Sequence, residues 1–120
     1  MNNIKFKYLY RDESNYKKYG HVVFSNPDGV SAEEVKTRLE KSFLQALLFN
    51  ASQVGLPELF FEDFPLPNDF TLHEFDGVET TDELPNDHRL RTIQQFMKKV
   101  EKESAKRWVV IDPLERLFRH

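Results

Sequence analysis

The chain has no cysteine, only 4 glycines and no long apolar run. Without cysteine there is no disulfide framework, no thiolate zinc site and no cysteine nucleophile. No two glycines lie close together, which excludes a glycine-rich phosphate loop. No apolar run approaches the roughly 20 residues that cross a bilayer, and the first residues lack the apolar stretch of a signal peptide. We therefore expect a cytoplasmic protein with no membrane partner.

Basic residues are absent from the middle of the chain. No lysine or arginine lies between Lys41 and Arg89, whereas this stretch holds ten of the 20 acidic residues. These acids are Glu58, Glu62, Asp63, Asp69, Glu74, Asp76, Glu79, Asp82, Glu83 and Asp87. The formal charge of −3 therefore combines an acidic middle with basic flanks that hold all 17 lysines and arginines. Such a block is typical either of a solvated acidic loop or of a surface that steers a basic partner.

The first half of the chain is patterned for a hairpin and a helix. Residues 4–11 alternate aromatic and basic side chains, which predicts a half-buried strand, and residues 21–25 predict a second, antiparallel strand. Ser31 begins a capping-box pattern, so we expect a helix over 32–47. Residues 47–62 fit either a longer helix or an extended segment.

The second half predicts shorter elements. Residues 59–61 fit a short strand or a buried segment, and 70–79 fit a strand that becomes irregular near Phe75. The next helix has two candidate caps, Asp87 and Thr92, of which Thr92 has the capping-box spacing with Gln95. Residues 108–111 predict a final strand.

This order of elements, β-β-α-(β-β)-α-β, predicts an α+β fold in which a small antiparallel sheet is packed on one face by two helices. We expect a single domain over residues 1–120, with 106–120 as a C-terminal extension. The apolar segment from Trp108 to Phe118 could form a homodimer contact. The predicted core consists of Phe6, Tyr8, Phe24, Leu39, Phe43, Phe96 and Val100.

Three short runs carry a resemblance to a known group of proteins. They are Lys-Tyr-Leu-Tyr-Arg-Asp at 7–12, Tyr16-Lys17, and Val-Phe-Ser-Asn-Pro at 23–27. Together with the acidic-aromatic runs at 57–61 and 73–75, they resemble a family of small bacterial proteins that has no assigned activity. The resemblance implies a bacterial source and a cytosolic setting, and it carries no catalytic residue to this chain.

The acidic block suggests that the chain works by contact with another protein. An inhibitor, immunity or adaptor role would set the acidic surface against a basic partner, without a cofactor or a metal. The binding residues predicted for this role are Glu58, Glu62, Asp63, Asp76, Glu79, Asp82 and Glu83.

A small metal-dependent or acid/base hydrolase is the first alternative. His73, Glu74 and Asp76 are crowded in sequence, with Glu62 and Asp63 not far away, and imidazole with carboxylates can bind a metal or transfer protons. The placement of these residues in the fold distinguishes an enzyme from an interaction module. An enzyme needs them to converge in a pocket, whereas a partner surface needs the acids to spread outward.

A nucleic-acid binder is the second alternative. On the N-terminal strand, Lys5, Lys7 and Arg11 alternate with Phe6 and other aromatic residues. Basic side chains suit contacts with phosphates, and aromatic side chains suit stacking on nucleobases. The alternation, however, places the basic side chains and the aromatic side chains on opposite faces of the strand. Since stacking needs both on one face, and the sequence pI is about 5.8, nucleic acid is the less favoured partner.

Overall fold

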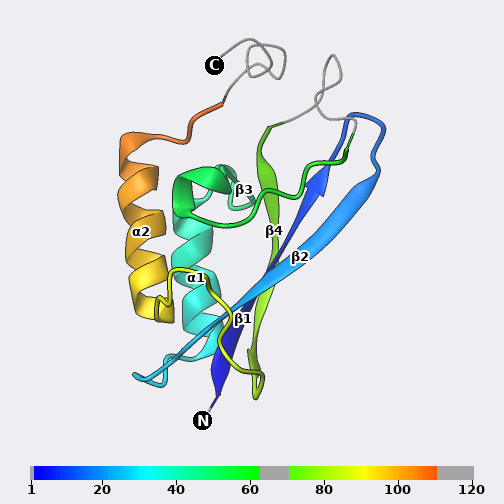
Figure 1. Cartoon of the computed structure of the whole chain (residues 1–120). Coiled ribbons are helices and arrows are strands. Elements are labelled where there is room, and N and C mark those ends of the chain that lie inside the picture. Colours follow the sequence, from blue (N-terminus) through cyan, green and yellow to red (C-terminus); the bar gives the residue numbers. More distant parts are fainter. Residues whose placement is uncertain (1, 63–70, 111–120) are drawn as a thin grey trace.

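The structure, a computed structural model, describes residues 2–62 and 71–110 and has an α+β fold with an antiparallel sheet (Figure 1). The strands follow the spatial order β2-β1-β4-β3, and each pairs antiparallel with its neighbour. The elements are β1 (Asn3–Arg11), β2 (Lys17–Phe24), α1 (Ala32–Ser42), β3 (Leu48–Phe49), the 3-10 helix η1 (Ser52–Val54), β4 (His73–Thr81) and α2 (Ile93–Lys106). The predicted fold class is confirmed.

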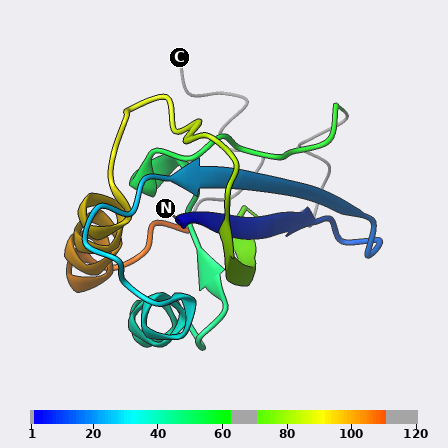
Figure 2. The ribbon, with the colours of Figure 1, turned by 90° about the horizontal axis from the view of Figure 1, so that it is seen from below.

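Both helices lie side by side on one face of the sheet, which we call the inner face (Figures 1 and 2). The alternation of β1 turns Phe6 and Tyr8 to this face and Lys5 and Lys7 to the opposite, outer face. The seven residues predicted for the core are all buried. Within residues 2–62 and 71–110, no helix is long and apolar enough to cross a bilayer.

The hairpin of β1 and β2 is longer than the sequence predicts. Strand β2 begins at Lys17 and not at residue 21, so residues 17–20 continue the ladder opposite β1 as far as Arg11. The connection is a tight turn in which the Asn15 amide donates to the Asp12 carbonyl and Asn15 adopts a left-handed φ of 69°. Asparagine tolerates this backbone region, which explains how so short a loop closes.

Helix α1 begins as predicted and ends five residues early. The Ser31 hydroxyl accepts a hydrogen bond from the Glu34 amide, but Phe43 already has an extended backbone, with φ −76° and ψ 145°. Its ring stacks on Phe49 at a centroid distance of 4.9 Å. Core packing of Phe43 therefore ends the helix, and the predicted extension to residue 47 is wrong.

Helix α2 and strand β4 follow their sequence signals closely. Thr92 forms the complete capping box with Gln95, which makes Thr92 the cap and excludes Asp87. In β4 the pairing register with β1 shifts so that Tyr8 lies opposite Phe75 and Lys7 opposite Gly77. The irregularity predicted near Phe75 is thus a β-bulge at Asp76.

Residues 59–61, for which the sequence leaves a short strand or a buried segment open, form no strand and are half-buried. The short strand that pairs with the start of β4 is β3, Leu48–Phe49. Residues 108–110 also lie outside any strand, because the Trp108 indole N–H donates to the Ser42 carbonyl at 2.9 Å and its ring packs on Phe43. The rest of the predicted dimer segment, residues 111–118, lies outside the described part of the chain.

Candidate functional site

The imidazole of His73 is enclosed on the inner face of the sheet. Its side chain is fully buried, and rings of Tyr8, Tyr10, Phe49 and Phe60 lie 5.1–6.3 Å from it. The Leu59 amide donates a hydrogen bond of 2.9 Å to the imidazole Nε2, so this nitrogen carries no proton. His73 therefore binds the 56–62 segment to the sheet and offers no surface to a substrate.

The two carboxylates next to His73 in the sequence lie elsewhere. Glu74 points to the outer face, where the Arg11 guanidinium donates to it at 2.8 Å, and Asp76 is exposed at the bulge. Among residues 2–62 and 71–110, no group of three or more His, Asp or Glu side chains could hold a metal ion. A surface hollow of about 680 Å³ lies along α1 from Ser31 to Lys41, and His73 is not part of its lining. The geometry brings none of the three candidate catalytic residues together.

The acids of β4 lie beside bases of β1, although the two blocks are far apart in sequence. Antiparallel pairing places Glu79 opposite Lys5, and the Lys5 ammonium forms ion pairs with both Glu79 and Glu83. The Lys7 ammonium lies 3.8 Å from Glu79. The lysine hydrogen bond, followed by that of Thr81, lowers the pKa of Glu83.

These pairs show that bases from a distant strand partly neutralise a stretch that has no lysine or arginine of its own. They also weaken the nucleic-acid alternative, because the bases of the N-terminal strand already face carboxylates. The side chains of Glu79 and Glu83 nevertheless remain 50% and 51% exposed. A surface ion pair with this exposure contributes little to stability, so a partner can compete for it.

Four acids form one continuous feature, which we call the acidic patch: Asp76, Glu79, Asp82 and Glu83, on β4 and the residues just after it. Asp76 and Asp82 are exposed, and within the described part of the chain no lysine or arginine pairs with either. Of the other predicted binding residues, Glu58 and Glu62 are exposed on the 56–62 segment. Asp63 lies outside the described residues, as does Asp69.

The segment that follows the patch is tied to the fold at several points. It runs from the end of β4 past β2 to α2 (Figure 1). The Val23 amide donates to the Asn86 side chain at 2.7 Å, and the Asn86 amide donates to the Val23 carbonyl at 3.0 Å. Asn86 therefore satisfies backbone groups on the outer edge of β2, which would otherwise present an unpaired strand.

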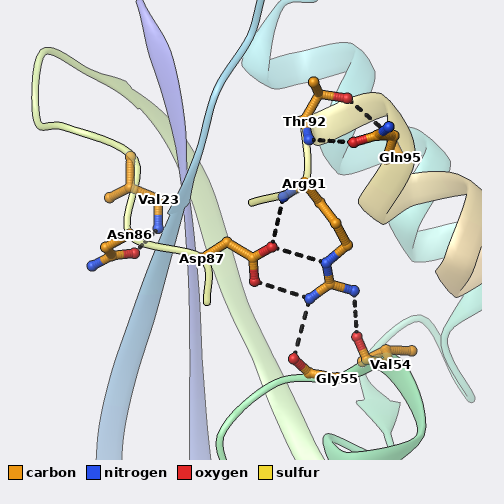
Figure 3. Close-up of polar contacts among 8 residues, drawn as sticks. All are labelled: Val23, Val54, Gly55, Asn86, Asp87, Arg91, Thr92 and Gln95. Atoms are coloured by element: carbon orange, nitrogen blue, oxygen red, sulfur yellow. Dashed lines mark hydrogen bonds and ion pairs between the residues drawn. The ribbon is translucent and has the colours of Figure 1, made fainter. Parts of the chain in front are cut away.

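Asp87 and Arg91 form a second anchor, buried beneath this segment (Figure 3). Asp87 accepts hydrogen bonds from the Arg91 guanidinium and from the Arg91 backbone amide. The same guanidinium donates to the carbonyls of Val54 and Gly55 and lies over the rings of Phe24 and Phe96. Asp87, counted in the sequence with the surface acids, is therefore a structural residue that is only 4% exposed.

This anchor predicts that the protein loses stability in acid. Burial alone would raise the pKa of Asp87, but the hydrogen bonds and charge of Arg91 outweigh it and hold the pKa below the ordinary value of 3.8. A carboxylate with a lowered folded-state pKa stabilises the fold above its unfolded pKa, and this contribution is lost as pH falls through the folded value. Urea unfolding should therefore show a smaller free energy at about pH 3 than at about pH 7. The Asp87→Asn variant should lose less of its free energy of unfolding than wild type between these two pH values. An equal loss would contradict the stabilising role given to the Asp87 carboxylate.

Comparison with known proteins gives no relative for this chain. No family model matches it, and neither the curated proteins nor the solved structures give a significant match. The case for a function therefore depends on the described residues alone.

Proposed function

We propose that this protein is an interaction module that binds a basic protein partner through the acidic patch. The observation that carries the proposal is the surplus of exposed carboxylates on β4 and the residues just after it. Glu79 and Glu83 contact the ammonium groups of Lys5 and Lys7, whereas Asp76 and Asp82 add two exposed carboxylates without such a pair in the described part of the chain. An inhibitor, immunity or adaptor role in a bacterial cytosol fits this surface and stays a prediction from the sequence.

The distribution of charge over the rest of the fold supports the same function. Helix α2 carries an excess of base, with exposed lysines at 98, 102 and 106, whereas acids and bases balance on α1. Glu79 and Glu83 of the acidic patch pair with Lys5 on the opposite face of the sheet. A molecule polarised in this way is oriented by the field of a basic partner before contact, which raises the association rate more than the final affinity.

The arrangement of the candidate catalytic residues favours a surface over an active site. Acid/base catalysis needs titratable groups within hydrogen-bond reach of one reacting atom. His73 is enclosed by aromatic rings on the inner face, whereas Glu74 and Asp76 are directed elsewhere. The acids that remain accessible spread along β4 and its following residues, as a docking surface requires.

A charge-matched pair of variants tests the proposal. The patch variant is Asp76→Asn, Glu79→Gln, Asp82→Asn and Glu83→Gln, and the control variant is Asp28→Asn, Glu33→Gln, Glu34→Gln and Glu40→Gln. The probe is a short fluorescein-labelled peptide of alternating lysine and serine, with binding followed by anisotropy. We expect the patch variant to bind about tenfold more weakly at low salt, because each exposed pair contributes about 0.2–1 kcal/mol.

The control variant has the same net charge as the patch variant and should bind almost as wild type. The salt dependence should also be flatter for the patch variant alone, since fewer charge pairs remain to be screened. Equal binding by the two variants would mean that the net charge of the protein, and not the acidic patch, attracts the lysine peptide. The proposal would then be wrong.

A further inference from the structure

Two leucines in the segment that follows the acidic patch stand almost completely in solvent. Leu84 is 84% exposed and Leu90 is 87% exposed, both in the segment between β4 and α2. Single exposed leucines are ordinary on protein surfaces. What sets these two apart is the rigidity of the segment that presents them and the backbone conformation of Leu90.

The segment is fixed on both sides of its central residues. Asn86 exchanges hydrogen bonds with Val23, and the Leu90 amide donates to the Asp87 carbonyl at 2.9 Å, which closes a turn. Asp87 is in turn held by Arg91 through its side chain and backbone amide. A partner that buries these leucines therefore orders little new chain, and such preorganisation favours affinity.

Leu90 occupies a backbone position that suits a different residue. Its φ of 55° lies in the left-handed region, which glycine and asparagine adopt readily and leucine adopts at a cost. A large apolar side chain in solvent gains nothing from burial in the isolated protein. Strain and exposure together indicate that this leucine is present for a contact outside the chain.

The charges beside Leu84 indicate what that contact is, although Leu90 follows the exposed Arg89. Asp82 and Glu83 directly precede Leu84, so one apolar anchor adjoins the acidic patch. We propose that Leu84 and Leu90 are the apolar anchors of the partner surface, and that the partner is a protein with an apolar groove bordered by lysine or arginine. This inference rests on the proposed function and adds the shape and chemistry of the partner.

A peptide pair separates the apolar contribution from the charge. One fluorescein-labelled peptide has leucines along one helical face with lysines beside them, and the second has serine in place of every leucine. The apolar variant is Leu84→Ser with Leu90→Asn, and the control is Leu44→Ser with Leu47→Ser, two exposed leucines outside the segment. We expect wild type and the control to bind the leucine peptide about tenfold more tightly than the serine peptide, given the gain from burying leucine.

The apolar variant should lose this preference while binding the serine peptide as wild type does. Thermal unfolding should show that it is folded and no less stable, because asparagine relieves the left-handed backbone at position 90. If the apolar variant keeps the leucine preference, or if it is destabilised, the inference is wrong while the charge-based proposal stands. If the patch variant fails to weaken binding of the serine peptide, the proposed function itself fails.

Discussion

Phe6→Ala should lower the free energy of unfolding by about 3–5 kcal/mol, the largest effect expected of any single truncation in the sheet. Phe6 is fully buried at the centre of the inner face. Its ring lies within 5.2–6.3 Å of the rings of Tyr8, Phe43, Phe49, Phe75 and Phe96, which come from the sheet, the end of α1 and α2. Removing the ring leaves a cavity that these neighbours can fill only in part.

Urea titration of Phe6→Ala beside Tyr16→Ala provides the measurement and its control. Tyr16 is also aromatic but is 69% exposed, so its truncation should change the stability by no more than about 0.5 kcal/mol. A loss below about 1 kcal/mol for Phe6→Ala would mean that the helices do not pack on this face of β1.

Arg91→Met should cost a comparable amount, about 3–5 kcal/mol, although only one charge is removed. The methionine keeps much of the apolar stem but lacks the guanidinium that lies over Phe24 and Phe96. In addition, the Asp87 carboxylate would remain buried without its base, and the carbonyls of Val54 and Gly55 would lose their donor. The penalty therefore comes mainly from groups left unsatisfied.

Two further variants identify that cause. Arg38→Met breaks a partly exposed ion pair between Arg38 on α1 and Glu101 on α2. This substitution should lower the free energy of unfolding by less than about 1 kcal/mol. The double variant Asp87→Leu with Arg91→Met removes both charges and should be more stable than Arg91→Met alone. If the double variant is the less stable of the two, the ion pair does not account for the effect.

The sequence predicted those parts of the fold that depend on local patterns. The alternation in β1 and the capping box at Thr92 specify an inner face and a helix start with nearby residues only, and both are confirmed. The end of α1 could not be predicted in this way. The apolar pattern continues past Ser42, and it is packing of Phe43 into the core, against Phe49 and against Phe6 of the distant strand β1, that turns the chain away.

The same distinction applies to the candidate site. The acidic stretch was visible in the sequence, but its neutralisation by Lys5 was not, because that contact depends on the pairing of strands distant in the chain. Asp87 counts among the acids of this stretch for the same reason, although its spacing of four residues from Arg91 is a usable signal. Leu84 and Leu90 are two apolar residues within a polar segment, and the sequence alone does not show that both stand in solvent.

The acidic patch is proposed as the surface where this protein meets its partner. Site-specific photo-crosslinking inside cells that express the full chain tests it directly, with the reactive side chain at position 82 in the patch or at position 36 on the solvent side of α1. The account predicts a discrete covalent adduct from position 82 and none from position 36. It also predicts loss of that adduct when Asp76, Glu79 and Glu83 are neutralised together. Equal adducts from both positions, or an adduct that survives neutralisation, would contradict it.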